Sequence, residues 1–184
     1  MKNIIIIGSM LLLTGTTAFS QEILSLNDPI FPSTHKIAKE QAAATPTYTT
    51  EQHFLTDFPN ATNIQWKRMG YEEVSFAMNG KDMKAFYDHN HKLIGSTISA
   101  HFTDLPAKAQ REIEKRYRNY TLQSVLLFHD NQYNATDMML YGNVFEDADN
   151  YFVELVNNEK TIVLQVNMEG LVTFYKDISY SNVK

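Results

Sequence analysis

The fold is decided by residues 71–87, which read YEEVSFAMNGKDMKAFY. Every second residue from Val74 to Met78 is apolar, and an alternation of period two indicates a strand with one buried face. Asn79 and Gly80 follow that strand. A type I′ turn needs positive φ at both central residues, and asparagine and glycine tolerate it best. This stretch therefore predicts a tight β-hairpin.

Outward from the hairpin, the pattern predicts one helix and further strands. Thr49 and Gln52 form a capping-box pattern at the start of a short helix, and Pro59 ends it. Alternating apolar residues predict strands at 64–68 and 93–100. The first part of the domain is thus expected to be one helix followed by four meandering antiparallel strands.

The pattern then restarts after residue 101. Thr103 or Asp104 can cap a second helix with Pro106 in its first turn. Its expected core stripe is Leu105, Ala109, Ile113 and Tyr117. The next strand, 122–128, is apolar enough to be buried in part on both faces. Residues 130–150 are an insertion, either a hairpin extension or a mobile loop.

The two halves match in order, which indicates an internal repeat. Residues 76–81 correspond to 155–160, and residues 87–91 correspond to 166–170. We therefore predict an α+β fold of two tandem α-β4 units, at about 49–101 and 102–176. Their strands are expected to form an antiparallel sheet with the helices packed on one face and the other face free.

The N-terminus has the features of an export signal. Lys2 precedes a short apolar run, and small and polar residues follow up to Ser20, so residues 1–20 are predicted to be a cleaved signal peptide. Residues 21–48 are expected to be a linker or a poorly ordered arm. The chain has no cysteine, which excludes a lipid-bearing thiol and disulfides. The expected location is the periplasm or the medium.

The segment 58–66, FPNATNIQW, resembles the exported PepSY-like, beta-lactamase-inhibitor-protein-like domains of Bacteroidetes. The resemblance extends over about residues 49–175. It implies the tandem α-β4 fold of that inhibitor protein, in which a curved sheet and its hairpin tips bind an enzyme. It also implies a relation to PepSY domains, which are proposed to regulate peptidases. This chain differs from the family pattern at Asn90 and His91, which replace an acidic residue and a glycine.

The sequence shows no recognisable catalytic motif. It contains neither a nucleophile elbow nor a glycine-rich phosphate loop, and no cofactor is expected. We therefore predict that the protein is not an enzyme. Its net charge of −5 disfavours nucleic acid and anionic membrane surfaces as partners. His89 and His91 beside Asp88 could offer ligands to a metal ion, but a third strong ligand is not evident nearby.

The abundance of aromatic residues favours a binding function, because aromatic side chains on a sheet are frequent anchors of protein contacts. We predict an exported, non-catalytic module that recognises a protein or peptide. The alternative is a small-molecule or metal-binding protein of the cell envelope. The residues predicted to contact the partner are Asn79, Gly80, Tyr87, Asp88, His89 and His91.

Overall fold

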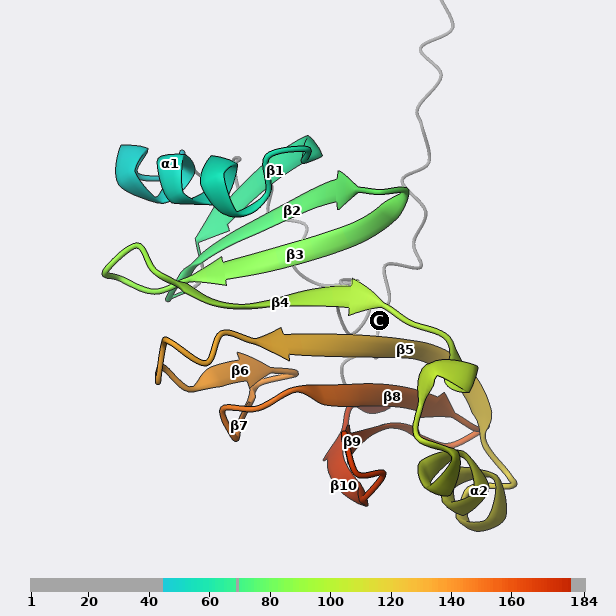
Figure 1. Ribbon diagram of the computed structural model, residues 1–184. Coiled ribbons are helices and arrows are strands. Elements are labelled where there is room, and N and C mark those ends of the chain that lie inside the picture. Colours follow the sequence, from blue (N-terminus) through green and yellow to red (C-terminus); the bar gives the residue numbers. More distant parts are fainter. Residues whose placement is uncertain (1–44, 69, 180–184) are drawn as a thin grey trace, which may run out of the picture.

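A computed structural model describes residues 45–68 and 70–179. The predicted signal peptide and most of the predicted linker lie outside these residues. One antiparallel sheet of eight strands dominates the fold, in the order β1-β2-β3-β4-β5-β8-β9-β10 (Figure 1). Its strands are β1 (Thr62–Arg68), β2 (Glu72–Met78), β3 (Lys81–Tyr87), β4 (Leu93–Ser99), β5 (Thr121–Asp130), β8 (Asn150–Val156), β9 (Thr161–Asn167) and β10 (Val172–Asp177).

Helix α1 (Tyr48–Asp57) begins two residues earlier than the sequence pattern predicts. Its N-cap is Thr47, whose side chain accepts a hydrogen bond from the backbone N–H of Thr50. The predicted capping box of Thr49 and Gln52 is therefore wrong. The helix ends before Pro59, as expected.

The second helix, α2 (Ala107–Arg116), follows a short 3₁₀ turn, η1 (Phe102–Asp104). Asp104 accepts a hydrogen bond from the backbone N–H of His101, so it closes η1 rather than capping α2. The N-cap position of α2 is Pro106, without a side-chain hydrogen bond. The predicted cap at Thr103 or Asp104 is therefore wrong as well.

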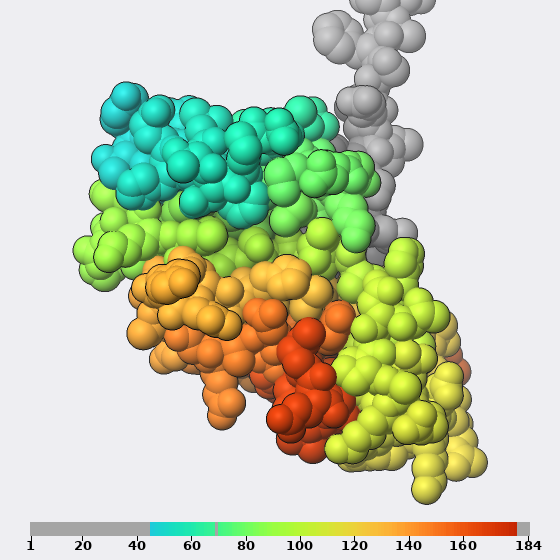
Figure 2. Space-filling model, in the orientation of Figure 1, coloured from blue at the N-terminus to red at the C-terminus, as the bar shows by residue number. Residues whose placement is uncertain are grey.

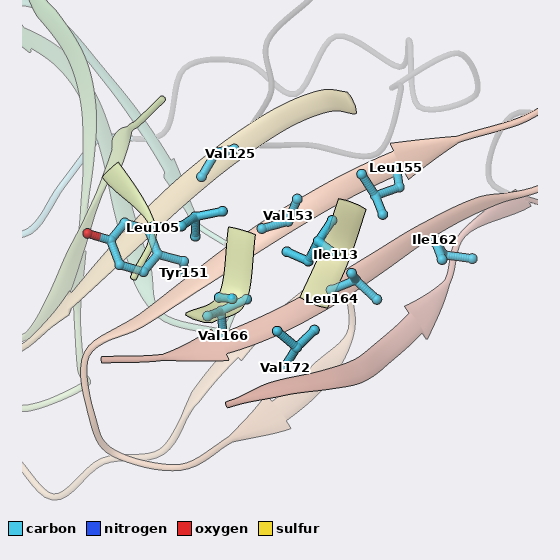
Figure 3. Packing of buried hydrophobic residues seen from close by; sticks show 11 residues of the cluster. Leu105, Ile113, Val125, Tyr151, Val153, Leu155, Ile162, Leu164, Val166 and Val172 are labelled. Atoms are coloured by element: carbon cyan, nitrogen blue, oxygen red, sulfur yellow. The ribbon is translucent and has the colours of Figure 1, made fainter. Parts of the chain in front are cut away.

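Both helices pack on the same face of the sheet. Phe54 of α1 lies against Trp66 and Phe76, with ring centroids 5.4 and 5.1 Å apart. Ala109 and Ile113 of α2 pack on the strands of the second half (Figure 3). The cross-strand register places one row of residues on this face, which we call the helix face: Met83, Ile98, Leu127, Tyr151, Val166 and Val172.

The opposite face, here called the far face, is not free as predicted. The insertion forms a hairpin of β6 (Met138–Leu140) and β7 (Asn143–Phe145) that packs on it. Hairpin and sheet together form a buried apolar cluster: Phe86, Ile94, Leu126, Phe128, Met138, Leu140, Phe145, Phe152, Val163 and Ile178. Because β5 has apolar residues on both faces, the sheet has two hydrophobic surfaces to cover. The helices cover one and the hairpin covers the other.

Candidate functional site

The turn at residues 88–91 joins β3 to β4 and is held by Asp88. One carboxylate oxygen, Oδ1, accepts hydrogen bonds from the backbone N–H groups of Asn90 and Lys92 at 2.8 and 2.9 Å. The other, Oδ2, accepts one from the amide of Asn134 at 3.2 Å. Asp88 is only 5% exposed. Its carboxylate therefore fixes the turn and ties the chain after β5 to it.

His91 connects the same turn to the N-terminus of α1. Its Nδ1 lies 3.0 Å from the hydroxyl of Thr47 and 2.9 Å from that of Thr50. The backbone oxygen of His91 also accepts a hydrogen bond from the ring of His53. The φ angle of His91 is 64°, in the left-handed region where glycine fits with less strain. The imidazole contacts give a physical reason for a histidine at this position.

The other predicted contact residues occupy different environments. Tyr87 is fully buried, and its hydroxyl donates a hydrogen bond to Asp57 at 2.9 Å. Burial, together with the nearby Asp57 carboxylate, raises the pKa of Tyr87 well above its usual value. His89 is exposed, as are Asn79 and Gly80 in their turn.

The structure does not bring all six predicted residues together. Asn79 and Gly80, whose φ angles of 55° and 75° are both positive as a type I′ turn requires, join β2 to β3. The turn at 88–91 lies at the opposite end of β3. A seven-residue strand separates the two turns by about 20 Å. Contact of these six residues with a partner stays a prediction.

The turn between β9 and β10 repeats the hydrogen bonds of the turn at 88–91. Asn167 Oδ1 accepts from the backbone N–H groups of Glu169 and Leu171 at 3.1 and 2.8 Å. The N–H of Asn167 donates to the carbonyl of Leu171, and the N–H of Gly170 donates to the carbonyl of Asn167. Asp88 is at the centre of the same set of bonds in the first half. The φ angle of Gly170 is 79°, similar to that of its counterpart His91.

A concave site lies on the far face beside the hairpin. It has a volume of about 570 Å³, and we call it the hairpin pocket. Figure 2 shows the orange surface of the hairpin adjoining the red surface of β10. The lining residues are Asp137, Val144, Phe145, Glu146, Asn150, Gln165, Asn167, Leu171 and Thr173.

The position of this pocket follows from the side chains of the sheet. Along one cross-strand row of the far face, Leu126 and Phe152 are apolar, whereas Gln165 and Thr173 are polar. The hairpin packs on the apolar part of the face. Where the strands become polar, burial beneath the hairpin would no longer be favourable without hydrogen-bond partners. The hairpin contacts the edge strand β10 at Tyr175, whose hydroxyl donates to the carbonyl of Asn143. It does not extend over Gln165 and Thr173, and this polar strip becomes the floor of the pocket.

Carboxylates gather where the hairpin leaves and rejoins the sheet. The backbone N–H of Asp130 donates to Asp149 at 2.7 Å, and His129 Nδ1 lies 3.4 Å from the same carboxylate. Desolvation, a hydrogen bond with Asp147 and the negative charges of Asp147 and Asp149 raise the pKa of Asp130 from 3.8 to about 6. When Asp130 is protonated, its carboxyl O–H can donate the hydrogen bond between Asp130 and Asp147, which two ionised carboxylates could not form.

The described residues show no group of three or more His, Asp or Glu side chains able to hold a metal ion. His91 instead directs its Nδ1 to the hydroxyls at the start of α1. None of the helices in 45–68 and 70–179 has the length and apolar character of a membrane span.

Sequence reasoning missed the hairpin pocket. Its lining residues come from segments that are far apart in the sequence, and alternation within each strand does not show that they meet. In addition, the sequence pattern did not decide whether residues 130–150 form a hairpin or a loop. The β6–β7 turn was hard to recognise because Tyr141 occupies its first central position with a φ of 52°. The available signal was Gly142 between two short apolar runs, which is compatible with a two-residue turn.

No family model and no curated protein matches this chain, but solved structures do. A BLIP-like protein from Bacteroides fragilis is 16% identical, with a TM-score of 0.58 over 74% of this chain and 89% of that one. A DUF2874 family protein from Bacteroides uniformis is 14% identical, with a TM-score of 0.61 over 75% and 93%. A protein from Bacteroides eggerthii, assigned to the periplasm by inference, is 12% identical, with a TM-score of 0.62 over 74% and 92%.

These identities support a conclusion about the fold alone. The likeness agrees with the sequence resemblance to inhibitor-like domains of Bacteroidetes, whereas the PepSY relation has no counterpart among these structures. The chain has the α+β fold, a mostly antiparallel sheet with two helices, of BLIP-like and DUF2874 proteins from Bacteroides.

Proposed function

We propose that the protein is an exported, non-catalytic module that binds a protein or peptide in the hairpin pocket. The observation that carries the proposal is the pocket itself. It is about 570 Å³ in volume, lies beside an edge strand and is open to side chains of another chain. This volume is within the range of pockets that bind small groups specifically.

The sequence and the fold support this function in three ways. The predicted signal peptide directs the chain out of the cytoplasm, and one protein of the same fold is assigned to the periplasm. Another is described as BLIP-like, which suggests a protein-binding fold. We read the two halves as tandem α-β4 units, because the turns centred on Asp88 and Asn167 share one hydrogen-bond pattern.

The two turns predicted to contact a partner lie at opposite ends of β3 and would contact it at different points. The turn at residues 88–91 and the hairpin pocket lie at the same end of the strands, so a large partner could contact His89 as well as the pocket. Asn79 and Gly80, at the other end, would form a second contact region. We assign Asp88 and His91 the role of shaping their turn, since their side chains are engaged in hydrogen bonds within the chain.

The test uses a substitution that fills the pocket. Peptides that bind the protein would be selected from a random display library, and their dissociation constants measured by calorimetry. Thr173 is exposed in the pocket lining, and Thr173→Trp would occupy it. We expect at least tenfold weaker binding. Mass spectrometry of the recovered peptide should show it intact, as a non-catalytic module requires.

Thr62→Trp is the matched control. Thr62 is also exposed on an edge strand, and its hydroxyl, like that of Thr173, donates to a backbone carbonyl of the neighbouring strand. The control variant should bind the peptides as the unmodified protein does. Equal affinity of both variants would show that the hairpin pocket is not the binding site, and cleaved peptide would show that the protein is catalytic.

A further inference from the structure

The ionisable residues that line the hairpin pocket are all acidic. Its two ionisable lining residues are Asp137 and Glu146, both exposed, and its lining contains no lysine, arginine or histidine. Within the described residues, neither carboxylate has a hydrogen bond or ion pair. Asp130 and Asp149, by contrast, are used in closing the base of the hairpin. The two pocket carboxylates are thus available to a ligand.

The chain segment that forms the hairpin and its base is itself acidic. Between Arg118 and Lys160 the sequence has no lysine or arginine. The acidic residues of the hairpin and its base are Asp130, Asp137, Glu146, Asp147 and Asp149. A concave site lined by charges of one sign concentrates ligands of the opposite sign.

The other lining groups complement a cation on an aliphatic stem. From the sheet, Asn150 and Gln165 contribute amide groups, and the Nδ2 of Asn150 already donates to the carbonyl of Ala148. Val144 and Leu171 are 56% and 52% exposed and supply apolar surface. Arginine and lysine side chains bury their methylene groups against such surface while the charged end meets acceptors.

A sugar is less well matched by the same lining. Carbohydrate sites use an exposed aromatic face on which the ring can stack. The only aromatic residue of the lining is Phe145, which is 6% exposed. Its ring is in edge contact with Phe128 and Phe152, at centroid distances of 4.9 and 5.0 Å. Phe145 is therefore part of the core rather than a stacking surface.

We infer that the hairpin pocket receives an arginine or lysine side chain presented by the partner, between the carboxylates of Asp137 and Glu146. This inference rests on the proposed function and adds the chemical class of the group recognised. A guanidinium group fits best, because its planar set of five donors can bond several carboxylate and amide oxygens at once.

The test is an NMR titration of the protein with two capped tripeptides, Gly-Arg-Gly and Gly-citrulline-Gly. Citrulline has nearly the shape of arginine and no charge. We expect the arginine peptide to shift the backbone amide signals of residues 144–146 and 165–173 saturably, and more weakly as salt is raised. The citrulline peptide should bind at least tenfold more weakly.

The double substitution Asp137→Asn with Glu146→Gln should reduce binding of the arginine peptide at least tenfold. The matched control is Asp82→Asn with Glu159→Gln, which removes the same charge at the opposite end of the strands. Unchanged spectra outside the substituted positions would show that each variant is folded. The control should bind as the unmodified protein does.

Three results would overturn the inference: equal binding of both tripeptides, equal binding by the two double variants, or saturable shifts of the pocket signals by N-acetylglucosamine alone. A neutral peptide that binds and is blocked by Thr173→Trp would leave the proposed function intact and remove only the preference for a cation. If no selected peptide is blocked by Thr173→Trp, the proposed function itself fails.

Discussion

At the scale of single residues, the acidic base of the hairpin shows how tertiary contacts change a side chain. Asp130 ends β5, and Asp147 and Asp149 precede β8, so carboxyl groups that meet in the fold are 17 or more positions apart in the sequence. In the unfolded chain these groups are solvated and far apart. Folding brings them together, and a proton on Asp130 then becomes favourable.

This proximity makes stability depend on pH. The pKa of Asp130 is raised in the folded state to about 6, so the folded protein binds this proton more tightly than the unfolded chain does. The resulting stabilisation is complete below about pH 4, the ordinary range of an aspartate, and is lost as the pH rises through about 6. Ionised Asp130 destabilises the fold at neutral pH.

We therefore expect Asp130→Asn to stabilise the protein more at pH 8 than at pH 4, because the amide cannot ionise. Allowing for solvent around a partly exposed group, the difference should be about 1 kcal/mol. Urea unfolding at both pH values measures it. Asp82→Asn removes the same charge far from the hairpin and reports the effect of net charge alone. A gain that is the same at both pH values would contradict the raised pKa.

At the scale of elements, the β6–β7 hairpin is the part of the fold that covers the far face. Phe145 is its main anchor, in contact with Phe128, Phe152 and Tyr175. Neighbouring Val144 also lines the pocket but is 56% exposed, whereas Phe145 is 6% exposed. Adjacent residues of one short strand therefore have different roles, as the alternation of a strand requires.

Phe145→Ala should lower the free energy of unfolding by about 3 kcal/mol, because it removes buried aromatic surface and leaves a cavity. Val144→Ala, its neighbour on the exposed side, should change it by less than about 0.5 kcal/mol. Chemical unfolding followed by circular dichroism measures both. Similar small effects for the two variants would mean that the hairpin is not packed on the sheet.

At the scale of the whole molecule, one sheet joins the two halves. The pairing of β4 with β5 connects them, from Gly95 opposite Asp130 to Ser99 opposite Leu126. Gly95 lets the Phe128 ring of β5 lie directly against the backbone of β4, because a Cβ at this position would lie 2.4 Å from that ring. We expect the halves to unfold together as one cooperative unit.

The single tryptophan makes this cooperativity measurable. Trp66 lies in the core of the first half, whereas Leu164 is fully buried in the second. Leu164→Ala should destabilise the protein by about 3 kcal/mol and lower the urea midpoint of Trp66 fluorescence as much as that of circular dichroism. If the fluorescence midpoint stays unchanged while the dichroism midpoint falls, the halves unfold independently.

Local patterns were sufficient for most of the elements. Alternation located the sheet strands, the Asn79 and Gly80 pair set the first hairpin, and Pro59 ended α1, because these signals act between neighbours in the sequence. Phe86 and Tyr87, which are adjacent on β3, belong to core clusters on opposite faces, as alternation along a strand requires. The cap of α1 was misassigned because Thr47, Thr49 and Thr50 all lie at its start, and Thr47 also contacts the distant Glu72 and His91.

Local patterns in the sequence predicted the α+β class, both helices and the strands of the main sheet. Tertiary packing places the insertion on the far face, lets Asp88 and His91 brace their turn, and brings Asp137 and Glu146 into one pocket with Gln165 and Thr173. The two kinds of feature depend on interactions over different distances along the chain. Alternation and turn propensity depend on adjacent residues, whereas the pocket depends on the packing of distant segments, which is fixed by the total apolar surface that both faces of the sheet must bury.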